Sequence, residues 1–144
     1  REMKIKNRLD PRQSLIGGAT YLTKLKSRLP DHIAEPDRTL LALAAYNVGF
    51  GHLEDARILT QRNGQDPDLW QDVREHLPKL SNKQYYRALK YGYARGSEPV
   101  IYVDNIQYYQ RYLELHQLSR QKEDITVDDS PATKEWDDNA PSSL

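Results

Sequence analysis

Apolar residues recur at helical spacing, three to four positions apart, through residues 1–119 of the chain. Prolines, glycines and small polar residues separate these runs, at the intervals expected for short helices joined by short loops. The β-branched residues are scattered, so no strand is expected. The pattern therefore predicts an all-α domain.

Two of the expected helices have well-marked ends. Asp10, Pro11 and Gln13 offer an N-cap carboxylate, a proline at the first helical position and a capping-box residue. A helix beginning there carries Leu15, Ala19, Leu22 and Leu29 at helical spacing. A second should start near Pro36 and end at the glycines 49 and 51. It is apolar on most sides, which predicts the central buried helix, with Leu40, Leu41, Leu43, Ala44 and Ala45.

Four more helices are expected after these glycines. The third covers His52–Arg62, and the fourth is a short segment opened by Asp66-Pro67 and ended by Pro78. A fifth runs from a capping box at residues 81–84 to near Gly96. The sixth is opened by Pro99 and carries along one face Tyr102, Ile106, Tyr109 and Leu113.

The pattern ends near Arg120. Residues 120–144 hold three Lys or Arg and seven Asp or Glu with little apolar periodicity, which predicts a disordered acidic tail. The two expected parts are thus 1–119, the folded portion, and 120–144. The first carries 18 basic and 14 acidic side chains, a surplus too small to indicate a nucleic-acid partner.

Composition excludes several kinds of chemistry. No cysteine is present, so disulfides and thiol catalysis are ruled out. The four histidines have no metal-binding spacing, and we expect neither a metal nor a cofactor. No apolar run approaches the roughly 20 residues of a membrane span, and no signal peptide is visible, so an export signal would lie outside this sequence.

The most informative stretch is residues 45–51, where an apolar helix ends in Tyr46-Asn47 beside Gly49 and Gly51. Such a site suits a sugar, because Tyr and Asn supply hydrogen-bond donors and acceptors next to a backbone with little bulk. The structural alternative, which spacing alone favours, is that Tyr46 belongs to the core, Asn47 caps the helix and the glycines turn the chain.

Eight of the ten tyrosines lie between residues 85 and 112. They could line a saccharide groove, although tyrosines at helical spacing are more often core or rim residues. No more than two or three are expected to touch a ligand, and Tyr102 is the best placed.

Cleavage of a glycosidic bond requires a carboxyl group in an apolar setting that raises its pKa. Glu54, Asp55, Glu98 and Asp104 are better interpreted as caps or solvated charges. No nucleophile-elbow pattern supports acyl transfer. The sequence therefore assigns no catalytic carboxylate.

Residues 43–57, Leu-Ala-Ala-Tyr-Asn-Val-Gly-Phe-Gly-His-Leu-Glu-Asp-Ala-Arg, resemble the Ala-Tyr-Asn-x-Gly region of soluble-lytic-transglycosylase-type domains. Three further blocks agree in order, at residues 9–22, 66–73 and 102–109. The resemblance covers roughly residues 7–115 and is strongest to the membrane-bound lytic transglycosylase F group.

This resemblance implies a goose-lysozyme-like helical fold that acts on peptidoglycan. The family cleaves the β-1,4 bond between N-acetylmuramic acid and N-acetylglucosamine and closes a 1,6-anhydro ring, with one glutamate serving first as acid and then as base. By resemblance, Tyr46 positions that glutamate, Asn47 and Gly49 shape the sugar cleft, and Tyr102 contacts substrate.

The family's catalytic Glu-Ser segment stands upstream of the block at residues 9–22 and is not found in these residues. We therefore expect the chain alone to be inactive and the parent protein to be a periplasmic, outer-membrane-associated enzyme. We also expect apolar surface exposed around residues 40–45, which favours self-association or association with the missing N-terminal portion. The alternatives are a non-catalytic glycan-binding or regulatory module and a helical domain that docks protein.

Overall fold

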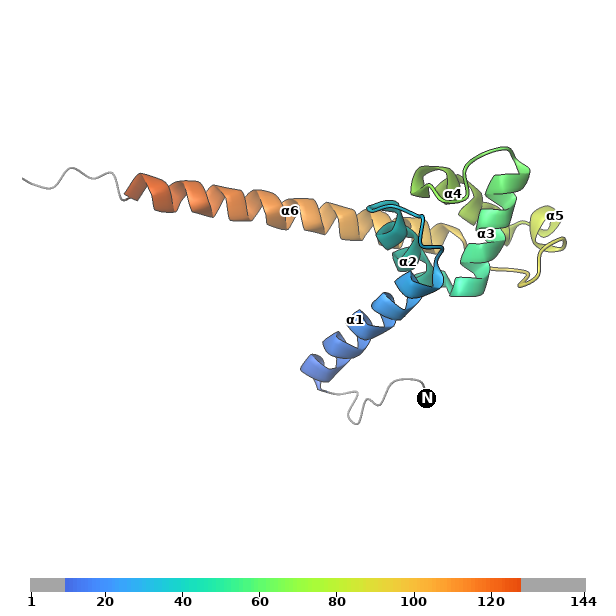
Figure 1. Ribbon diagram of the computed structural model, residues 1–144, viewed down its shortest axis with the longest axis horizontal. Helices are drawn as coiled ribbons and strands as arrows, with labels where there is room; N and C mark the ends of the chain where they lie inside the picture. Colours follow the sequence, from blue (N-terminus) through green and yellow to red (C-terminus); the bar gives the residue numbers. More distant parts are fainter. Residues whose placement is uncertain (1–9, 128–144) are drawn as a thin grey trace, which may run out of the picture. The chain divides into compact units, whose positions relative to one another are not determined.

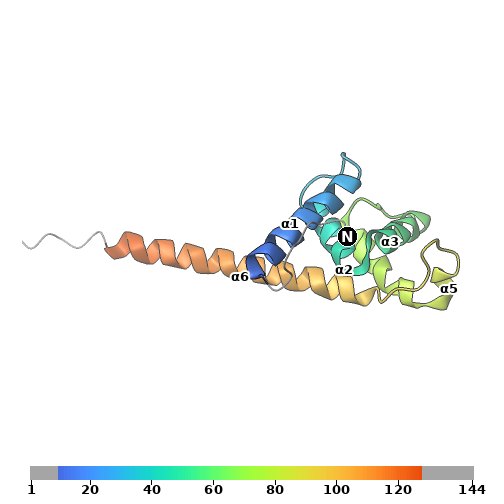
Figure 2. The ribbon, with the colours of Figure 1, turned by 90° about the horizontal axis from the view of Figure 1, so that it is seen from below.

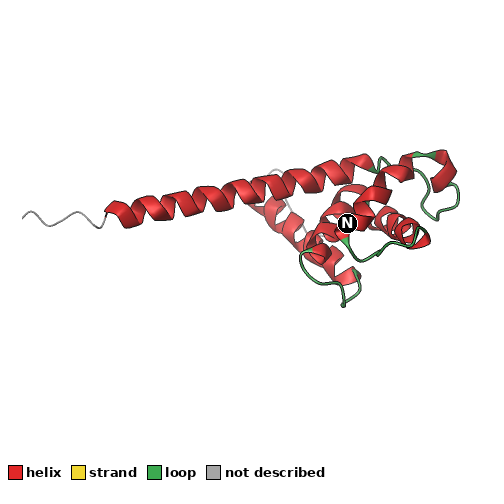
Figure 3. Cartoon of the chain, turned by 90° about the horizontal axis from the view of Figure 1, so that it is seen from above, coloured by secondary structure: helices red, strands yellow, loops and turns green. Residues whose placement is uncertain are grey.

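The computed structural model describes residues 10–127 of the chain, and every regular element in this range is a helix (Figure 3). The all-α prediction is confirmed. In order, the elements are α1 (Pro11–Arg28), α2 (Asp37–Val48), α3 (Phe50–Arg62), α4 (Trp70–His76), the 3₁₀ helix η1 (Leu77–Ser81), α5 (Lys83–Tyr86) and α6 (Ser97–Val127). No helix in this part of the chain is both long and apolar enough to cross a membrane.

The start of α1 follows the predicted capping pattern. The Asp10 side chain accepts a hydrogen bond from the Arg12 backbone N–H at 3.0 Å, and Pro11 takes the first helical position. The end of the helix is fixed by packing, because Leu25 and Leu29 are buried. The N-terminal half of α1 is much more exposed, since Leu15 is 75% and Ile16 58% exposed.

The predicted central helix is confirmed as α2, which lies between α1 and α3 (Figures 1 and 2). All six residues from Leu40 to Ala45 are buried. The expectation that this stretch exposes apolar surface is therefore wrong, because α1, α3 and α4 cover it on different sides. Exposed apolar side chains lie elsewhere in the described residues, among them Leu15 and Ile16 of α1.

The predicted fifth helix is mostly absent. Only Lys83–Tyr86 is helical, with the Asn82 side chain rather than Ser81 accepting from the Gln84 backbone N–H. Residues 87–96 follow an irregular path in which Gly92 has a φ of +76°. Long-range contacts replace the helical hydrogen bonds there, because the Tyr91 N–H donates to the Asp55 carboxylate at 2.8 Å.

The sixth helix is longer than predicted. α6 continues to Val127, so residues 120–127 are helical and the predicted disorder is wrong for them. The reason is local, because this stretch begins with Arg, Gln and Lys, straight-chain residues that favour a helix without a buried face. The rest of the predicted tail, 128–144, lies outside the described residues. Backbone contacts divide the chain into two units between Gln107 and Tyr108.

Candidate functional site

A groove of about 330 Å³ opens on the first unit, which ends at Gln107. Its walls come from the exposed half of α1, the last turns of α2 and the beginning of α6. Most of the lining is apolar, with hydroxyl groups at three positions. The lining residues are Ser14, Leu15, Gly18, Ala19, Leu22, Leu43, Tyr46 and Tyr102.

Three tyrosines form a continuous contact beside this groove. The Tyr46 ring meets the edge of Tyr21 with centroids 5.5 Å apart and lies parallel to Tyr102 at 6.4 Å. These contacts hold the ring by two neighbours from different helices while Tyr46 stays 39% exposed. The arrangement fixes a hydroxyl-bearing aromatic ring at the open edge of an apolar groove.

The Tyr46 hydroxyl lies close to the backbone of α1. A Cβ atom at Gly18 would come within 3.3 Å of it, so glycine leaves the space that this hydroxyl occupies. Burial raises the pKa of the Tyr102 hydroxyl above its ordinary value, and Tyr46 raises it further. Tyr102 therefore keeps its proton at neutral pH and can donate a hydrogen bond.

Asn47 and Gly49 follow Tyr46 in the chain but do not line the groove. Asn47 is exposed and does not cap α2. Gly49 is the cap, with a φ of +94°, and its N–H donates to the Ala45 carbonyl at 2.9 Å. The Gly49 carbonyl then accepts from Leu53 at 3.1 Å, so one residue ends α2 and begins α3.

Sequence reasoning missed Gly18, which lines the groove, and Tyr21, whose ring packs against Tyr46. Tyr21 lies outside the tyrosine-rich region, and Gly18 was one of two adjacent glycines in a helix. A signal for both was present, because Ser14, Gly18 and Tyr21 follow one another at helical spacing and so share a face of α1.

Residues 1–69 match the family described as "Transglycosylase SLT domain". This part of the chain is a transglycosylase SLT domain segment. The match takes in α1, α2 and α3, and with them Tyr21 and Tyr46, whereas Tyr102 lies beyond it. The resemblance predicted from the sequence blocks is confirmed.

Relatives extend the similarity beyond the matched segment. A membrane-bound lytic murein transglycosylase F of Pseudomonas putida is 61% identical over 107 residues, 74% of this chain and 22% of that protein. The protein of the same name from Pseudoalteromonas translucida is 56% identical over 109 residues, 76% of this chain and 23% of its own length. The protein of the same name from Saccharophagus degradans is 52% identical over 122 residues, which are 85% of this chain and 24% of that protein. The chain thus spans about a quarter of the length of these relatives.

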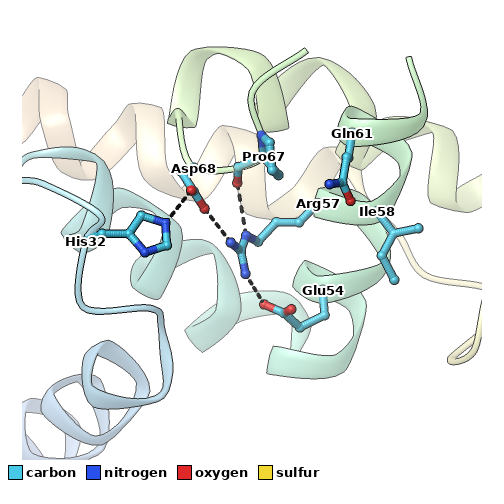
Figure 4. Close-up of a pocket in the computed structure, with 7 residues that line it drawn as sticks. All are labelled: His32, Glu54, Arg57, Ile58, Gln61, Pro67 and Asp68. Carbon is cyan, nitrogen blue, oxygen red and sulfur yellow. Dashed lines mark hydrogen bonds and ion pairs between the residues drawn. The ribbon is translucent and has the colours of Figure 1, made fainter. Parts of the chain in front are cut away.

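The SLT segment holds a second, polar pocket of about 270 Å³ (Figure 4). At its centre Arg57 donates to the Pro67 carbonyl at 2.9 Å, to Glu54 at 2.8 Å and to Asp68 at 2.5 Å. His32 contacts the other Asp68 oxygen at 2.7 Å. Every nitrogen of the guanidinium thus has an acceptor, which indicates a clamp joining α3 to the loop that contains Pro67 and Asp68.

The pKa shifts agree with a mutually stabilising clamp. Burial lowers the pKa of Arg57, but Glu54 and Asp68 together raise it above its ordinary value. Burial raises the pKa of Asp68, but hydrogen bonds from His32 and Arg57 bring it below its ordinary value. Glu54, expected to be a cap or a solvated charge, is therefore an ion-pair partner of Arg57.

The other three candidate carboxylates also have structural partners. Asp55 is fully buried and accepts backbone N–H groups, so it is no solvated charge. Asp104 pairs with Arg74 at 2.8 Å and Glu98 with Arg95 at 3.3 Å. None of the residues that line the groove is a carboxylate. Within residues 10–127, no group of three or more His, Cys, Asp or Glu could hold a metal ion.

Proposed function

We propose that this chain is the C-terminal portion of the lysozyme-like domain of a peptidoglycan lytic transglycosylase. The parent enzyme would cleave the β-1,4 bond between N-acetylmuramic acid and N-acetylglucosamine with formation of 1,6-anhydro-N-acetylmuramic acid. The catalytic glutamate would lie upstream of these residues. The observation that carries the proposal is Tyr46, held between Tyr21 and Tyr102 at the edge of a groove in an SLT segment.

The groove has the chemistry of a sugar site. Its volume of about 330 Å³ is at the lower end of the range for ligand pockets, roughly 300–1,000 Å³, as suits a single saccharide unit in a longer strand. Apolar walls can contact the C–H faces of a pyranose ring. Tyr46 and Tyr102 can hydrogen-bond to its hydroxyl or N-acetyl groups.

Tyr46 has a second proposed role beside the reacting bond. A tyrosine hydroxyl can donate a hydrogen bond to a carboxylate, which orients that carboxylate for proton transfer. The two flanking rings limit rotation of Tyr46, so the direction of this donor is set before substrate arrives. Asn47 and Gly49 would act from the turn that follows, Gly49 by setting the junction of α2 and α3.

The test is the product formed from purified peptidoglycan. The chain is incubated alone and with the N-terminal portion of a relative such as that of Pseudomonas putida, and 1,6-anhydromuropeptides are measured by mass spectrometry. We expect products only from the mixture. Products from the chain alone would show that a catalytic acid is present in it, against the proposal.

Tyr46→Phe is the sharpest variant for this assay, because it removes the hydroxyl and keeps the ring between Tyr21 and Tyr102. We expect product formation by the mixture to fall about 10-fold or more, as when a hydrogen bond to a reacting group is lost. Tyr112→Phe, in the second unit, is the matched control. Unchanged product with Tyr46→Phe would refute the role given to this hydroxyl.

The partners follow from the same proposal. Peptidoglycan strands are the substrate, and the N-terminal portion of the domain associates with this chain through the exposed α1 residue Ile16, which is not part of the groove. The parent enzyme would act in the periplasm at the outer membrane. Glycan binding without product in either incubation would favour the alternative, a non-catalytic glycan-binding or regulatory module.

A further inference from the structure

The segment from Lys83 to Gly96, here called the basic aromatic segment, is distinct in charge from the rest of the folded unit. It contains four basic residues and no Asp or Glu. The basic side chains of this segment are Lys83, Arg87, Lys90 and Arg95, all of them exposed. Two of its tyrosines are exposed as well, Tyr91 at 50% and Tyr93 at 57%.

A buried carboxylate holds this segment in place. Asp55 of α3 is fully buried, and it accepts the Tyr91 N–H at 2.8 Å and the Lys90 N–H at 3.3 Å. Burying a carboxylate is costly unless it is hydrogen-bonded, so these two bonds couple the position of the segment to the stability of α3. An exposed stretch that only connects two helices does not require such an anchor.

The anchor places Tyr91 against the glycine-rich turn after Tyr46. A Cβ atom at Gly51 would come within 2.6 Å of the Tyr91 ring, so only glycine allows this approach. His52 meets the same ring edge-on, with centroids 6.2 Å apart. Tyr91 therefore packs against Gly51 and His52 in the first turn of α3, where the predicted sugar-site stretch ends.

Rings and cations alternate on the exposed side of the segment. The Lys90 ammonium lies 5.4 Å from the centre of the Tyr91 ring. Tyr93 is held edge-on by Tyr86, with ring centroids 5.9 Å apart. A single bound chain could therefore meet aromatic faces and positive charges together.

We propose that the basic aromatic segment is a second contact surface for the glycan strand, specific for glycan that carries peptide stems. Tyr91 and Tyr93 would contact the C–H faces of sugar rings, while Lys90 and its basic neighbours would meet the carboxylates of the stems. Asp55 is then a positioning residue, because it acts by fixing the backbone at Lys90 and Tyr91. The inference rests on the proposed function and adds the substrate feature that this surface recognises.

The experiment compares two ligands for the whole chain. Insoluble peptidoglycan sacculi carry stem carboxylates and are assayed by co-sedimentation, whereas a chitin oligosaccharide is uncharged and is assayed by titration calorimetry. Tyr91→Ala and Lys90→Gln test the segment, and Tyr46→Ala tests the groove. The controls are Tyr112→Ala and Arg62→Gln, which remove an exposed ring and an exposed cation elsewhere.

We expect Tyr91→Ala to weaken sacculus binding about threefold to tenfold, the range expected for losing one aromatic contact. Lys90→Gln should weaken it about twofold to fivefold at low salt and less at high salt, since salt screens exposed charges. Binding of the chitin oligosaccharide should be unchanged in Lys90→Gln, because this ligand has no carboxylate. It should fall in Tyr91→Ala, because that ring contacts sugar, and it should be lost in Tyr46→Ala. Far-ultraviolet circular dichroism checks that each variant is folded.

The outcomes separate the two proposals. Sacculus binding unchanged in Tyr91→Ala and Lys90→Gln would overturn this inference and leave the groove intact. Loss of sacculus binding in Tyr91→Ala and Lys90→Gln but not in Tyr46→Ala would support the basic aromatic segment as a glycan surface and would count against the groove as a sugar site. Loss of chitin binding in Lys90→Gln to the same extent as loss of sacculus binding would overturn the specificity for stems. Binding of a single-stranded oligonucleotide that requires the segment, with sacculi unaffected, would replace the glycan by nucleic acid.

Discussion

Replacing Gly96 with alanine should destabilise the chain more than replacing Gly64. Gly64 follows α3 and Gly96 directly precedes α6, and their surroundings differ. A Cβ atom at Gly96 would lie 1.6 Å from the Leu77 carbonyl oxygen and 2.4 Å from its carbon. At Gly64 nothing lies within 4 Å, and the cost of alanine comes only from a φ of +76°.

The expected magnitudes follow from these contacts. An ordinary carbon–oxygen contact is about 3.3–3.6 Å, so Gly96→Ala must move backbone by well over 1 Å on one side. Overpacking usually costs about 1–3 kcal/mol, and a clash with backbone belongs at or above the top of that range. The left-handed conformation at Gly64 should cost about 1–2 kcal/mol.

Urea denaturation followed by far-ultraviolet circular dichroism measures both variants. We expect Gly96→Ala to lower the free energy of unfolding by about 3 kcal/mol or more and Gly64→Ala by about 1–2 kcal/mol. The denaturant slope should stay the same if the fold is retained. A loss for Gly96→Ala equal to or below that for Gly64→Ala would refute the close approach of Gly96 to Leu77.

Two other predictions concern carboxylates. The folded-state pKa of Asp68 is lowered, so its contribution to stability is present above the ordinary aspartate pKa of about 3.9 and is lost as pH falls below it. The free energy of unfolding, measured from neutral to acidic pH, should therefore fall less in Asp68→Asn than in the unaltered chain. The same fall in both proteins would contradict this. Asp55→Asn leaves one oxygen for two backbone donors, so hydrogen exchange at the amides of Lys90 and Tyr91 should accelerate and stability should fall by about 1–3 kcal/mol. Exchange as slow as in the unaltered chain would argue against the anchor.

Capping residues and apolar runs in the sequence correctly predicted α1 and α2. The Asp10-Pro11 pair set the start of α1, and the apolar run from Leu40 to Ala45 identified α2 as the central helix. Each depends on capping or on burial of a continuous run, which neighbouring residues encode. The contact between the rings of Tyr46 and Tyr102 was not predicted. The resemblance gave each residue a role in the sugar site, but 56 positions separate the two and no local pattern joins them.

The structure differs from the sequence-based prediction in two places, one because of contacts between distant residues and one because of helix propensity. Residues 87–96 were expected to be helical, and a buried carboxylate 36 positions before Tyr91 holds them in another conformation. No local pattern shows which acidic residue will be buried in this way. Residues 120–127 were expected to be disordered because apolar periodicity was the main criterion, and straight-chain residues sustain the helix without it.

The two attachments of residues 91–96 bear on how related chains can diverge. Asp55 holds the backbone at Tyr91, and the Leu77 carbonyl leaves room only for glycine at Gly96. Between these points Tyr93 and Arg95 face solvent, so their identities can change without disturbing either attachment. The number of residues cannot change as freely, because the distance between the attachments is set by α3 and η1. Homologous proteins should therefore differ here in side chains, while insertions and deletions are rare.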